Sequence, residues 1–369
     1  MPNTRILIPI IGFGRAGGYR VLSQLASSWV DQGCVVDFLV HEALAAPYFP
    51  TKAGVRRITS VGAVTEATVS STPQSAKHPP RALEIYKCLY TGLMAVGSEY
   101  DVIFANHSLT TYPVFFASCG NAKKVYYIQA YEPDYFAVRP GLKNAVLRRL
   151  SRYSYRLPLF QVANASTYLN YPGIRARSWV PPGIDRRVFY RRTVPPRFEE
   201  GKPWTIGSIG RPERDKGTAV VQQAFESLAR SDANVRLLLA YGKANSDWCH
   251  ERAEIVRPRN DTELAAFYRS VDVLVAVPTQ QFGAFHYPVL EAMSCGTPVI
   301  STGHMPANAK NAWLVGPNDA AEIVAALRDV REMATSQLAA LLDRAEHSAA
   351  EYEWDAVSER FLRLMIDKE

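Results

Sequence analysis

Residues 277–298 read VPTQQFGAFHYPVLEAMSCGTP, and this stretch decides the fold that we predict for the whole chain. An apolar run over residues 271–277 leads into it and indicates a buried parallel strand. Pro288 suits the first turn of a helix, where a missing backbone N–H costs nothing, and Gly296 suits its end. Another strand is expected from Pro298 onward. The order strand, loop, helix, strand predicts an α/β domain. Its helix N-terminus lies beyond the carboxyl ends of parallel strands, where a phosphate is favoured.

Glu291 lies one turn inside this expected helix. A lone glutamate on a helix is usually a solvated surface residue. Here the helix begins at a predicted phosphate site, so we predict that Glu291 accepts hydrogen bonds from a diol such as a ribose.

The same stretch resembles the donor-binding signature of retaining GT-B glycosyltransferases, a family 4-like group (group 1). The family pattern is Glu, seven residues, Glu, running into Ala-Met-x-x-Gly-x-Pro-Val, and residues 291–299 (EAMSCGTPV) match its second half. The first half departs, because Gly283 stands at the first Glu and His286 at a usually small residue. The resemblance implies a donor-binding set made of Gly283, Ala284, Phe285, His286, Tyr287, Pro288, Val289 and Glu291.

Length and composition fit two domains of ordinary size, since the chain has 369 residues and 47% of them are hydrophobic. No apolar run reaches the roughly 18 residues of a membrane span, and the N-terminus lacks the pattern of a signal peptide. The five cysteines are scattered without a CxxC pair. These features predict a reduced, cytoplasmic protein. No metal site is expected, since the histidines show no HxxxH spacing.

The net charge of +7 is concentrated in two runs of arginine. A solvated basic face is the plain interpretation. The more specific one is a patch that faces anionic lipid headgroups or a diphosphate-linked acceptor, on the inner face of a membrane. We expect no nucleic-acid partner, because no nucleic-acid-binding module is visible. The arginines are Arg148, Arg149, Arg152 and Arg156, followed by Arg175, Arg177, Arg186, Arg187, Arg191 and Arg192.

The chain opens with a βαβ pattern: a strand over residues 5–11, a helix over 19–32 and a strand over 34–40. Gly12, Gly14 and Gly17 satisfy the GxGxxG fingerprint, so a nicotinamide-dependent oxidoreductase is one alternative. The glycosyltransferase resemblance instead implies that Gly17 and Gly18 line the site of the donor phosphates and the acceptor. Residues 55–81 are polar and rich in Pro and Ser, which predicts a surface loop.

Two later segments of the first half carry chemistry. His107 follows an expected strand over residues 101–105, and the resemblance implies that it touches the sugar near the reacting carbon. Residues 129–136 (QAYEPDYF) resemble the Gln-Asp-x-Glu-Pro segment of bacterial polysaccharide rhamnosyltransferases, with Ala130 in place of Asp. We predict that Glu132 and Asp134 lie on the acceptor side.

The second half opens with a strand over residues 205–209 and the turn GRPERDKG at 210–217. Arg211 and Lys216 are placed to converge on one anionic group. In the resembled family this phrase grips the donor diphosphate and neutralises the leaving group, which gives both residues a catalytic role without a metal. The loop that contains Arg257 is implied to hold the nucleotide base.

We therefore predict a GT-B architecture, two Rossmann-like domains facing across a cleft: an acceptor-side domain over residues 1–190, a linker over 191–203, a nucleotide-sugar-binding domain over 204–350 and a C-terminal helix over 351–369 that returns to the first domain. The predicted activity is retaining transfer from a nucleotide-diphosphate sugar, preferably a deoxyhexose such as dTDP-rhamnose, to a glycan or lipid-linked acceptor. No cofactor is expected. Alternatives are a UDP- or GDP-hexose transferase of the same fold, or a catalytically degenerate glycan-binding protein.

Overall fold

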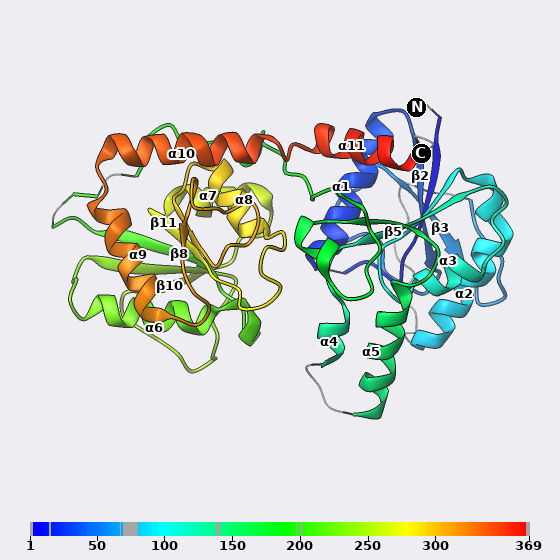
Figure 1. Cartoon of the computed structure of the whole chain (residues 1–369), viewed down its shortest axis with the longest axis horizontal. Coiled ribbons are helices and arrows are strands. Elements are labelled where there is room, and N and C mark those ends of the chain that lie inside the picture. The colour runs from blue at the N-terminus through cyan, green and yellow to red at the C-terminus, as the bar shows by residue number, and fades with distance from the viewer. Residues whose placement is uncertain are drawn as a thin grey trace. The chain divides into compact units, whose positions relative to one another are not determined.

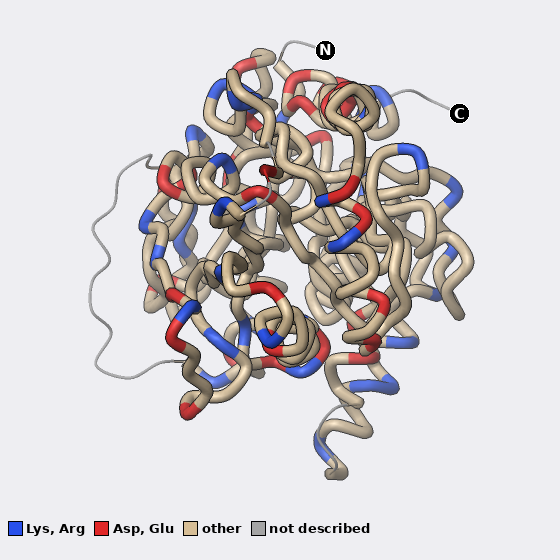
Figure 2. Tube along the Cα trace, turned by 90° about the vertical axis from the view of Figure 1, so that its left-hand side faces the viewer, with Lys and Arg blue, Asp and Glu red and all other residues tan. Residues whose placement is uncertain are grey.

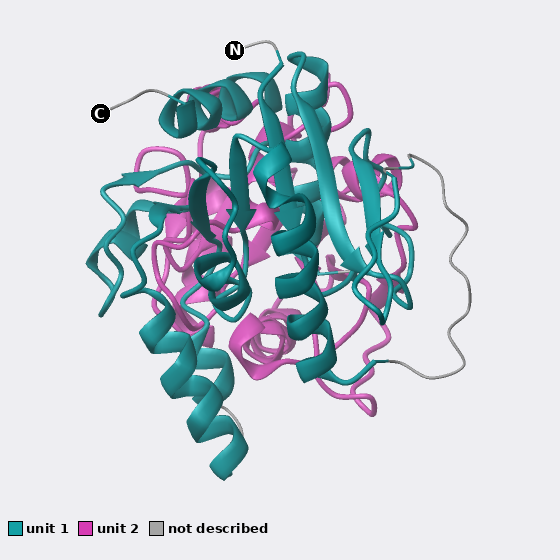
Figure 3. Ribbon diagram, turned by 90° about the vertical axis from the view of Figure 1, so that its right-hand side faces the viewer, with its two compact units in different colours: residues 1–183, 354–369 teal, residues 184–353 magenta. Residues whose placement is uncertain are grey.

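The computed structural model describes residues 3–14, 16–66, 68, 80–137, 141–196, 198–199 and 201–366 (Figure 1). The chain divides into two compact units, residues 1–183 with 354–369 and residues 184–353 (Figure 3). None of the helices in these described ranges combines the length and the apolar character that a membrane span requires.

Unit 1 is built on a seven-stranded parallel sheet in the order β3-β2-β1-β4-β5-β6-β7. This is the Rossmann order. The chain first adds strands on one side of β1 and then crosses over, so that the strand order reverses between β1 and β4. Its strands are β1 (Arg5–Pro9), β2 (Val35–His41), β3 (Gly54–Ile58), β4 (Val102–Ala105), β5 (Lys123–Ile128), β6 (Phe160–Ala163) and β7 (Ser178–Trp179). Its helices are α1 (Gly17–Asp31), α2 (Ala82–Val96), α3 (Thr111–Phe116), α4 (Pro133–Ala137), α5 (Leu142–Ser154) and α11 (Trp354–Ile366), with short 3₁₀ turns η1 (Gly97–Glu99) and η2 (Ser166–Asn170).

Unit 2 repeats the same strand order on a six-stranded parallel sheet, β10-β9-β8-β11-β12-β13. Its strands are β8 (Trp204–Ile209), β9 (Val235–Ala240), β10 (Ala253–Val256), β11 (Val273–Ala276), β12 (Val299–Ser301) and β13 (Trp313–Leu314). Its helices are α6 (Thr218–Ala229), α7 (Asp261–Ser270), α8 (Tyr287–Ser294), α9 (Ala320–Glu332) and α10 (Thr335–Ala350), with the 3₁₀ turn η3 (Arg214–Lys216). The predicted fold class, with two Rossmann-like domains, is confirmed.

Helix α11 completes the core of unit 1 although it is the last element of the chain (Figure 1). Phe361 is fully buried and its ring packs edge-on against the rings of Trp29 and Phe104. The Trp29 indole N–H donates to the Ser358 carbonyl at 3.1 Å. Burial of a large aromatic side chain contributes about 1.5–3 kcal/mol, so this contact fastens α11 to α1.

The division between the units falls at Gly183, so residues 184–203 belong to unit 2, whereas the sequence suggested a linker over 191–203. Phe189 explains this position, because its side chain is completely buried in the core of unit 2. Arg191 is fastened to α10 through ion pairs with Asp343 and Glu346. The segment is anchored too well to one unit to act as a free hinge.

One prediction about local structure was wrong. Residues 55–81 were expected to form a loop, but β3 occupies its first part and pairs in parallel with β2 over five residues. Its sequence, GVRRI, is short and carries two arginines, as suits a strand at the edge of a sheet, and therefore shows no apolar run. Residues 69–79 lie outside the described part of the chain.

Candidate donor and catalytic site

Most of the predicted site residues follow the two neighbouring strands between which the strand order of each sheet reverses. In unit 2, the turn at 210–217 follows β8 and the loop at 277–286 follows β11, and these two strands are neighbours. In unit 1, the glycine-rich loop follows β1 and His107 follows β4, which are also neighbours. Ligands of open α/β sheets bind outside the carboxyl ends of the strands at such points.

Two glycines hold the turn at 210–217 tightly against neighbouring strand ends. A Cβ on Gly210 would lie 1.8 Å from the carbonyl oxygen of Gly242, and one on Gly217 would lie 2.1 Å from that of Val277. Gly217 also has a φ of +76°, a conformation that favours glycine. No other residue fits at either position without moving backbone. The turn is therefore fixed at the ends of β8, β9 and β11.

Arg211 and Lys216 both lie in this turn, and both are partly exposed. The Arg211 guanidinium contacts the Glu213 carboxylate at 3.2 Å, and Lys216 Nζ lies 2.8 Å from Asp215 Oδ2. The hydrogen bond from Arg211 is the main cause of the lowered pKa of Glu213. Each cation thus has an acidic neighbour inside the turn. An incoming diphosphate would have to compete with these surface ion pairs, which are weak.

The loop before α8 departs from the family pattern in its backbone as well as its side chain. Gly283 has a φ of +76°. A glutamate in this conformation would be strained, because side chains larger than glycine rarely adopt it. The loop is tied down next to Gly283: Met305 N–H donates to the Ala284 carbonyl at 2.9 Å, and His286 N–H donates to the Met305 carbonyl at 3.0 Å.

His286 and His304 form a neutral pair at the start of α8. Their ring centroids are 5.7 Å apart. Burial, followed by the nearby His304 and Lys216, lowers the pKa of His286 well below its usual value. The pKa of His304 is also lowered, chiefly by burial. The turn that contains Lys216 is also tied to the loop that leads into α8, because the Thr279 N–H donates to the Asp215 carbonyl at 2.9 Å. The N-terminus of α8 favours an anion, as does the charge of Lys216.

Helix α8 has the boundaries that the sequence predicts. His286 is its N-cap and Pro288 lies in its first turn. At its end, Gly296 N–H donates to the Met293 carbonyl and Thr297 N–H to the Ala292 carbonyl, and Gly296 has a φ of +70°. This is a Schellman motif, which glycine permits at low cost.

Glu291 lies on the buried side of α8, with 2% of its surface exposed. Its Oε2 accepts a hydrogen bond from the Tyr268 hydroxyl at 2.8 Å. Burial is the first cause of the strongly raised pKa of Tyr268, and the charge of Glu291 adds to it. The solvated-helix interpretation of Glu291 is therefore wrong. A ribose would have to meet this carboxylate beside Tyr268. Arg257, in contrast, is exposed just after β10.

His107 in unit 1 is held by its backbone neighbours and lies beside Glu132. Its Nδ1 accepts a hydrogen bond from the Leu109 backbone N–H at 3.2 Å, and its Nε2 lies 3.1 Å from Glu132 Oε2. Glu132 is 6% exposed and also accepts from the Ser108 N–H and hydroxyl. Glu132 therefore contacts His107 directly and orients it. Its carboxylate, which was predicted to lie on the acceptor side, already contacts Ser108 and His107.

The charge of Glu132 acts on four tyrosines, of which Tyr126 and Tyr155 are buried and the other two half-buried. Burial is the main cause of their raised pKa values, and the negative charge of Glu132 adds to the rise in each; they are Tyr19, Tyr86, Tyr126 and Tyr155. Gly18 is also close, because a Cβ there would lie 3.3 Å from Gln129 Oε1, whereas Gly17 has open space beside it. The glycine loop, His107 and Glu132 thus come together in unit 1. Asp134 lies in α4, and burial raises its pKa.

Three residues of these sites were not predicted: Ser108, Tyr268 and His304. Ser108 directly follows His107, so its place beside Glu132 could have been expected. Tyr268 lies on the buried face of α7, and nothing in the sequence pairs it with Glu291. His304 follows β12, the strand next to β11. The only feature of the sequence that indicated a role at the site was the position of this polar residue after a strand end.

The comparisons with known proteins agree with this geometry. Residues 203–332 match the family described as Glycosyl transferases group 1, so unit 2 carries a glycosyltransferase domain. D-inositol 3-phosphate glycosyltransferase of Corynebacterium jeikeium is 29% identical over 213 residues, 50% of this chain and 50% of that protein. The chain thus matches only half the length of this relative.

Solved structures resemble the whole chain. Sucrose-phosphate synthase of Thermosynechococcus elongatus gives a TM-score of 0.70 at 17% identity, covering 98% of both chains. HepE of Anabaena, solved with UDP and glucose, gives 0.71 at 17% identity, covering 99% of this chain and 100% of that one. The fold is therefore GT-B.

Proposed function

We propose that the protein transfers a sugar from a nucleotide-diphosphate sugar to an acceptor hydroxyl with retention of configuration. The observation that carries this proposal is the arrangement in unit 2. Lys216 lies in a turn that Gly210 and Gly217 fix at the strand ends, and the neighbouring Asp215 carbonyl accepts from the Thr279 N–H in the loop that leads into α8. A cation and a helix N-terminus together favour a diphosphate.

In the proposed reaction the bond between the anomeric carbon and the diphosphate oxygen breaks, and the acceptor oxygen bonds to that carbon on the same face. The acceptor proton passes to the departing diphosphate. Lys216 and Arg211 stabilise the charge on the leaving group, a role that needs no metal ion. Glu291 binds the ribose, Arg257 lies in the loop that meets the base, and His107 contacts the transferred sugar.

A deoxyhexose donor, such as dTDP-rhamnose, is the donor that we favour. Gly283 supplies no carboxylate for sugar hydroxyls, and its positive φ disfavours one there. Hydroxyls that enter a buried site without partners lose about 1–3 kcal/mol each, so a sugar with fewer hydroxyls is preferred. The similarity of residues 129–136 to rhamnosyltransferases points the same way.

A UDP- or GDP-hexose is the second candidate donor, because HepE, which has the same fold, was solved with UDP and glucose. The two candidates are separated by a competition of dTDP-rhamnose, UDP-glucose, UDP-N-acetylglucosamine and GDP-mannose for the purified protein. Binding is read as a rise in melting temperature, since a ligand that binds only the folded state stabilises it. Preference for a fully hydroxylated hexose would overturn the donor assignment and leave the transferase proposal standing.

We place the acceptor among glycans and lipid-linked glycans of the cell surface, reached from the cytoplasmic side of the membrane. A catalytically degenerate protein that only binds glycans would show no turnover of any donor. Slow hydrolysis of the donor in the absence of acceptor, measured as release of nucleoside diphosphate with and without EDTA, tests this point. Hydrolysis that stops with EDTA would contradict the metal-independent mechanism.

A further inference from the structure

Helix α5 forms, with α4, a projection that extends away from the sheet of unit 1 (Figures 1 and 3). Its inner side packs through the buried Ser151 and Ser154, and the Tyr112 hydroxyl of α3 donates to the Leu150 carbonyl at 2.8 Å. We infer that the outer face of α5 docks on the anionic headgroups of a lipid membrane.

The outer face carries an apolar stripe that no described residue covers. Leu142, Val146, Leu150 and Tyr153 follow one another at intervals of four, four and three residues, which places them on one side of a helix. Their exposed fractions are 83%, 50%, 40% and 55%. Large apolar side chains are usually buried, so four exposed in a row on one helix indicate a contact surface.

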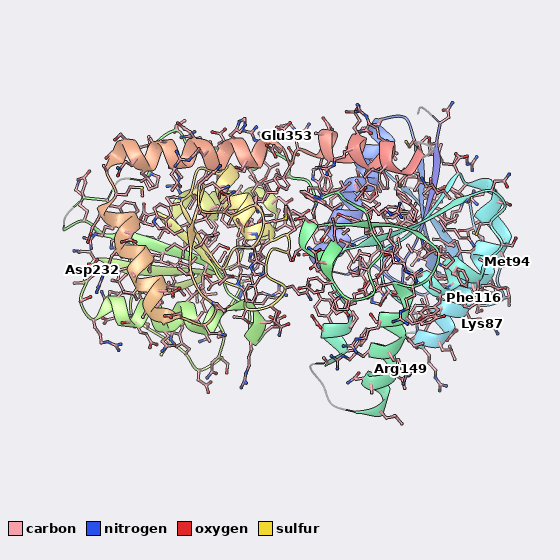
Figure 4. The ribbon with its side chains drawn as sticks, viewed as in Figure 1. Lys87, Met94, Phe116, Arg149, Asp232 and Glu353 are labelled. Atoms are coloured by element: carbon pink, nitrogen blue, oxygen red, sulfur yellow. The ribbon has the colours of Figure 1, made fainter. Side chains whose placement is uncertain are left out.

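Positive charge accompanies this stripe. The sequence of α5, LKNAVLRRLSRYS, contains Lys143, Arg148, Arg149 and Arg152 and no acidic residue. Within the described part of the chain, no ion pair engages Lys143, Arg149 or Arg152. The charges of Arg148 and Arg152 do act on Asp134 of α4, where they oppose the rise in the pKa of that carboxyl group. Figure 2 shows the basic positions along the projection, and Figure 4 labels Arg149 there.

Three of the later arginines have structural partners inside unit 2. Arg186 and Arg191 form ion pairs with Glu346 of α10. Arg192 is partly buried and donates to the Tyr268 and Val271 carbonyls and to Thr297. The expectation that these three form part of a basic patch is therefore corrected. Arg175, Arg177 and Arg187 are exposed, and α5 is the helix in which exposed arginines accompany an apolar stripe.

Charge decides between possible occupants of this face. A second copy of the chain would bring the same basic, acid-free helix against itself, and like charges repel. The headgroups of an anionic lipid surface complement the arginines, and the apolar stripe is buried at the boundary between headgroups and acyl chains. Amphipathic basic helices bind membranes in this way. This inference names the membrane partner of the proposed transferase. It does not depend on turnover, because lipid binding is measured without donor.

The experiment is co-sedimentation of the full-length protein with phosphatidylcholine vesicles containing 30% phosphatidylglycerol, at low and high salt, with pure phosphatidylcholine as comparison. Binding is expected on anionic vesicles only. It should weaken as salt screens the charges, because the screening length falls from about 10 Å at 0.1 M to about 3 Å at 1 M.

Two paired variants test the two parts of the face. Arg149→Ala/Arg152→Ala should weaken binding about 25-fold, the effect expected for losing two cations near an anionic surface. Val146→Glu/Leu150→Glu should weaken it at least about tenfold. The matched controls, which should bind like the unaltered protein, carry the same changes at exposed positions elsewhere: Arg187→Ala/Arg230→Ala and Val61→Glu/Leu314→Glu.

Several outcomes would overturn the inference: no vesicle binding at low salt, equal binding to neutral vesicles, or equal losses in test and control variants. A concentration-dependent dimer that Val146→Glu/Leu150→Glu dissociates, without lipid binding, would assign the face to a second copy. The same variants should keep the melting-temperature response to the preferred donor. Loss of that response alone would count against the proposed donor site and leave the membrane result intact.

Discussion

Replacing Glu132 by glutamine tests whether this buried residue orients His107. Glutamine keeps the volume but replaces one oxygen by an amide nitrogen. Both carboxylate oxygens accept hydrogen bonds, Oε1 from the Ser108 N–H at 2.9 Å and Oε2 from the Ser108 hydroxyl at 2.6 Å, and His107 Nε2 lies 3.1 Å from Oε2. Whichever way the amide turns, one of these donors meets another donor.

The size of the effect follows from the bonds that are lost. A hydrogen bond to a charged group contributes about 1.5–3 kcal/mol. If His107 contacts the sugar only in its present orientation, losing that energy in the transition state lowers turnover by about 10- to 150-fold. The KM for the donor should change little, because we propose that the nucleotide binds to unit 2. Steady-state kinetics of Glu132→Gln with the preferred donor measures this separation of kcat from KM.

The controls separate orientation from general destabilisation. Asp37 is another buried carboxylate of unit 1, accepts from the Tyr100 hydroxyl at 2.6 Å, and has no assigned role at the site, so Asp37→Asn should reduce stability and leave turnover unchanged. In a double-mutant cycle, Glu132→Gln should add little to His107→Ala, because it acts through the same ring. Additive losses, or full turnover in Glu132→Gln, would refute the reasoning.

Three further predictions concern unit 2. Arg211→Ala and Lys216→Ala should each lower turnover at least about tenfold, while Arg214→Ala in the same turn should not; full activity in both would contradict their role in stabilising the leaving group. Glu291→Gln should weaken the binding of nucleoside diphosphate in calorimetry without unfolding the protein, and unchanged affinity would leave Glu291 with only its bond to Tyr268. His286 has a pKa below its unfolded value, so the folded state resists its protonation: the corresponding stability is present above about pH 6.5 and is lost as the pH falls, by up to about 1.4 kcal/mol per pH unit. Urea unfolding at pH 7.5 and 5.5 should show a smaller loss for His286→Asn, and an equal loss in both proteins would contradict the assignment.

The strands with continuous apolar runs could be predicted from the sequence because parallel strands buried on both faces leave that pattern. The predicted start of β11 and the predicted bounds of α8 agree with the structure to within two residues. Strand β3 could not be predicted this way, since Arg56 and Arg57 interrupt its apolar character. Helix α5 was missed for a related reason: its apolar residues face solvent, so its pattern indicates only a basic surface.

Positions within the site followed from strand ends, but the partners of each side chain did not. His107 and Glu132 follow neighbouring strands β4 and β5, so their proximity was implied by sheet topology. The sequence does not show that Glu132 is directed at His107 instead of outward, because this depends on the burial of Glu132 and on its hydrogen bonds from Ser108. Similarly, Arg186 and Arg191 are indistinguishable in sequence from the arginines of α5, and only their ion pairs with α10 separate the two groups.

Gly283 shows how a departure from a family pattern acquires a physical meaning. In the sequence alone, Gly283 shows only that the carboxylate of the family pattern is missing at this position. Another residue could supply that carboxylate. In the structure its φ is +76° and the next residue, Ala284, pairs through its carbonyl with the Met305 N–H, so the loop follows a path that favours glycine. Restoring a glutamate there would have to move this backbone before its carboxylate reached a sugar. Gly283→Glu should therefore lower the free energy of unfolding by about 1–2 kcal/mol and should not create a hexose preference. We therefore expect the donor specificity of this site to depend on the loop backbone between β11 and α8, together with His286 and His304, more than on a single missing side chain.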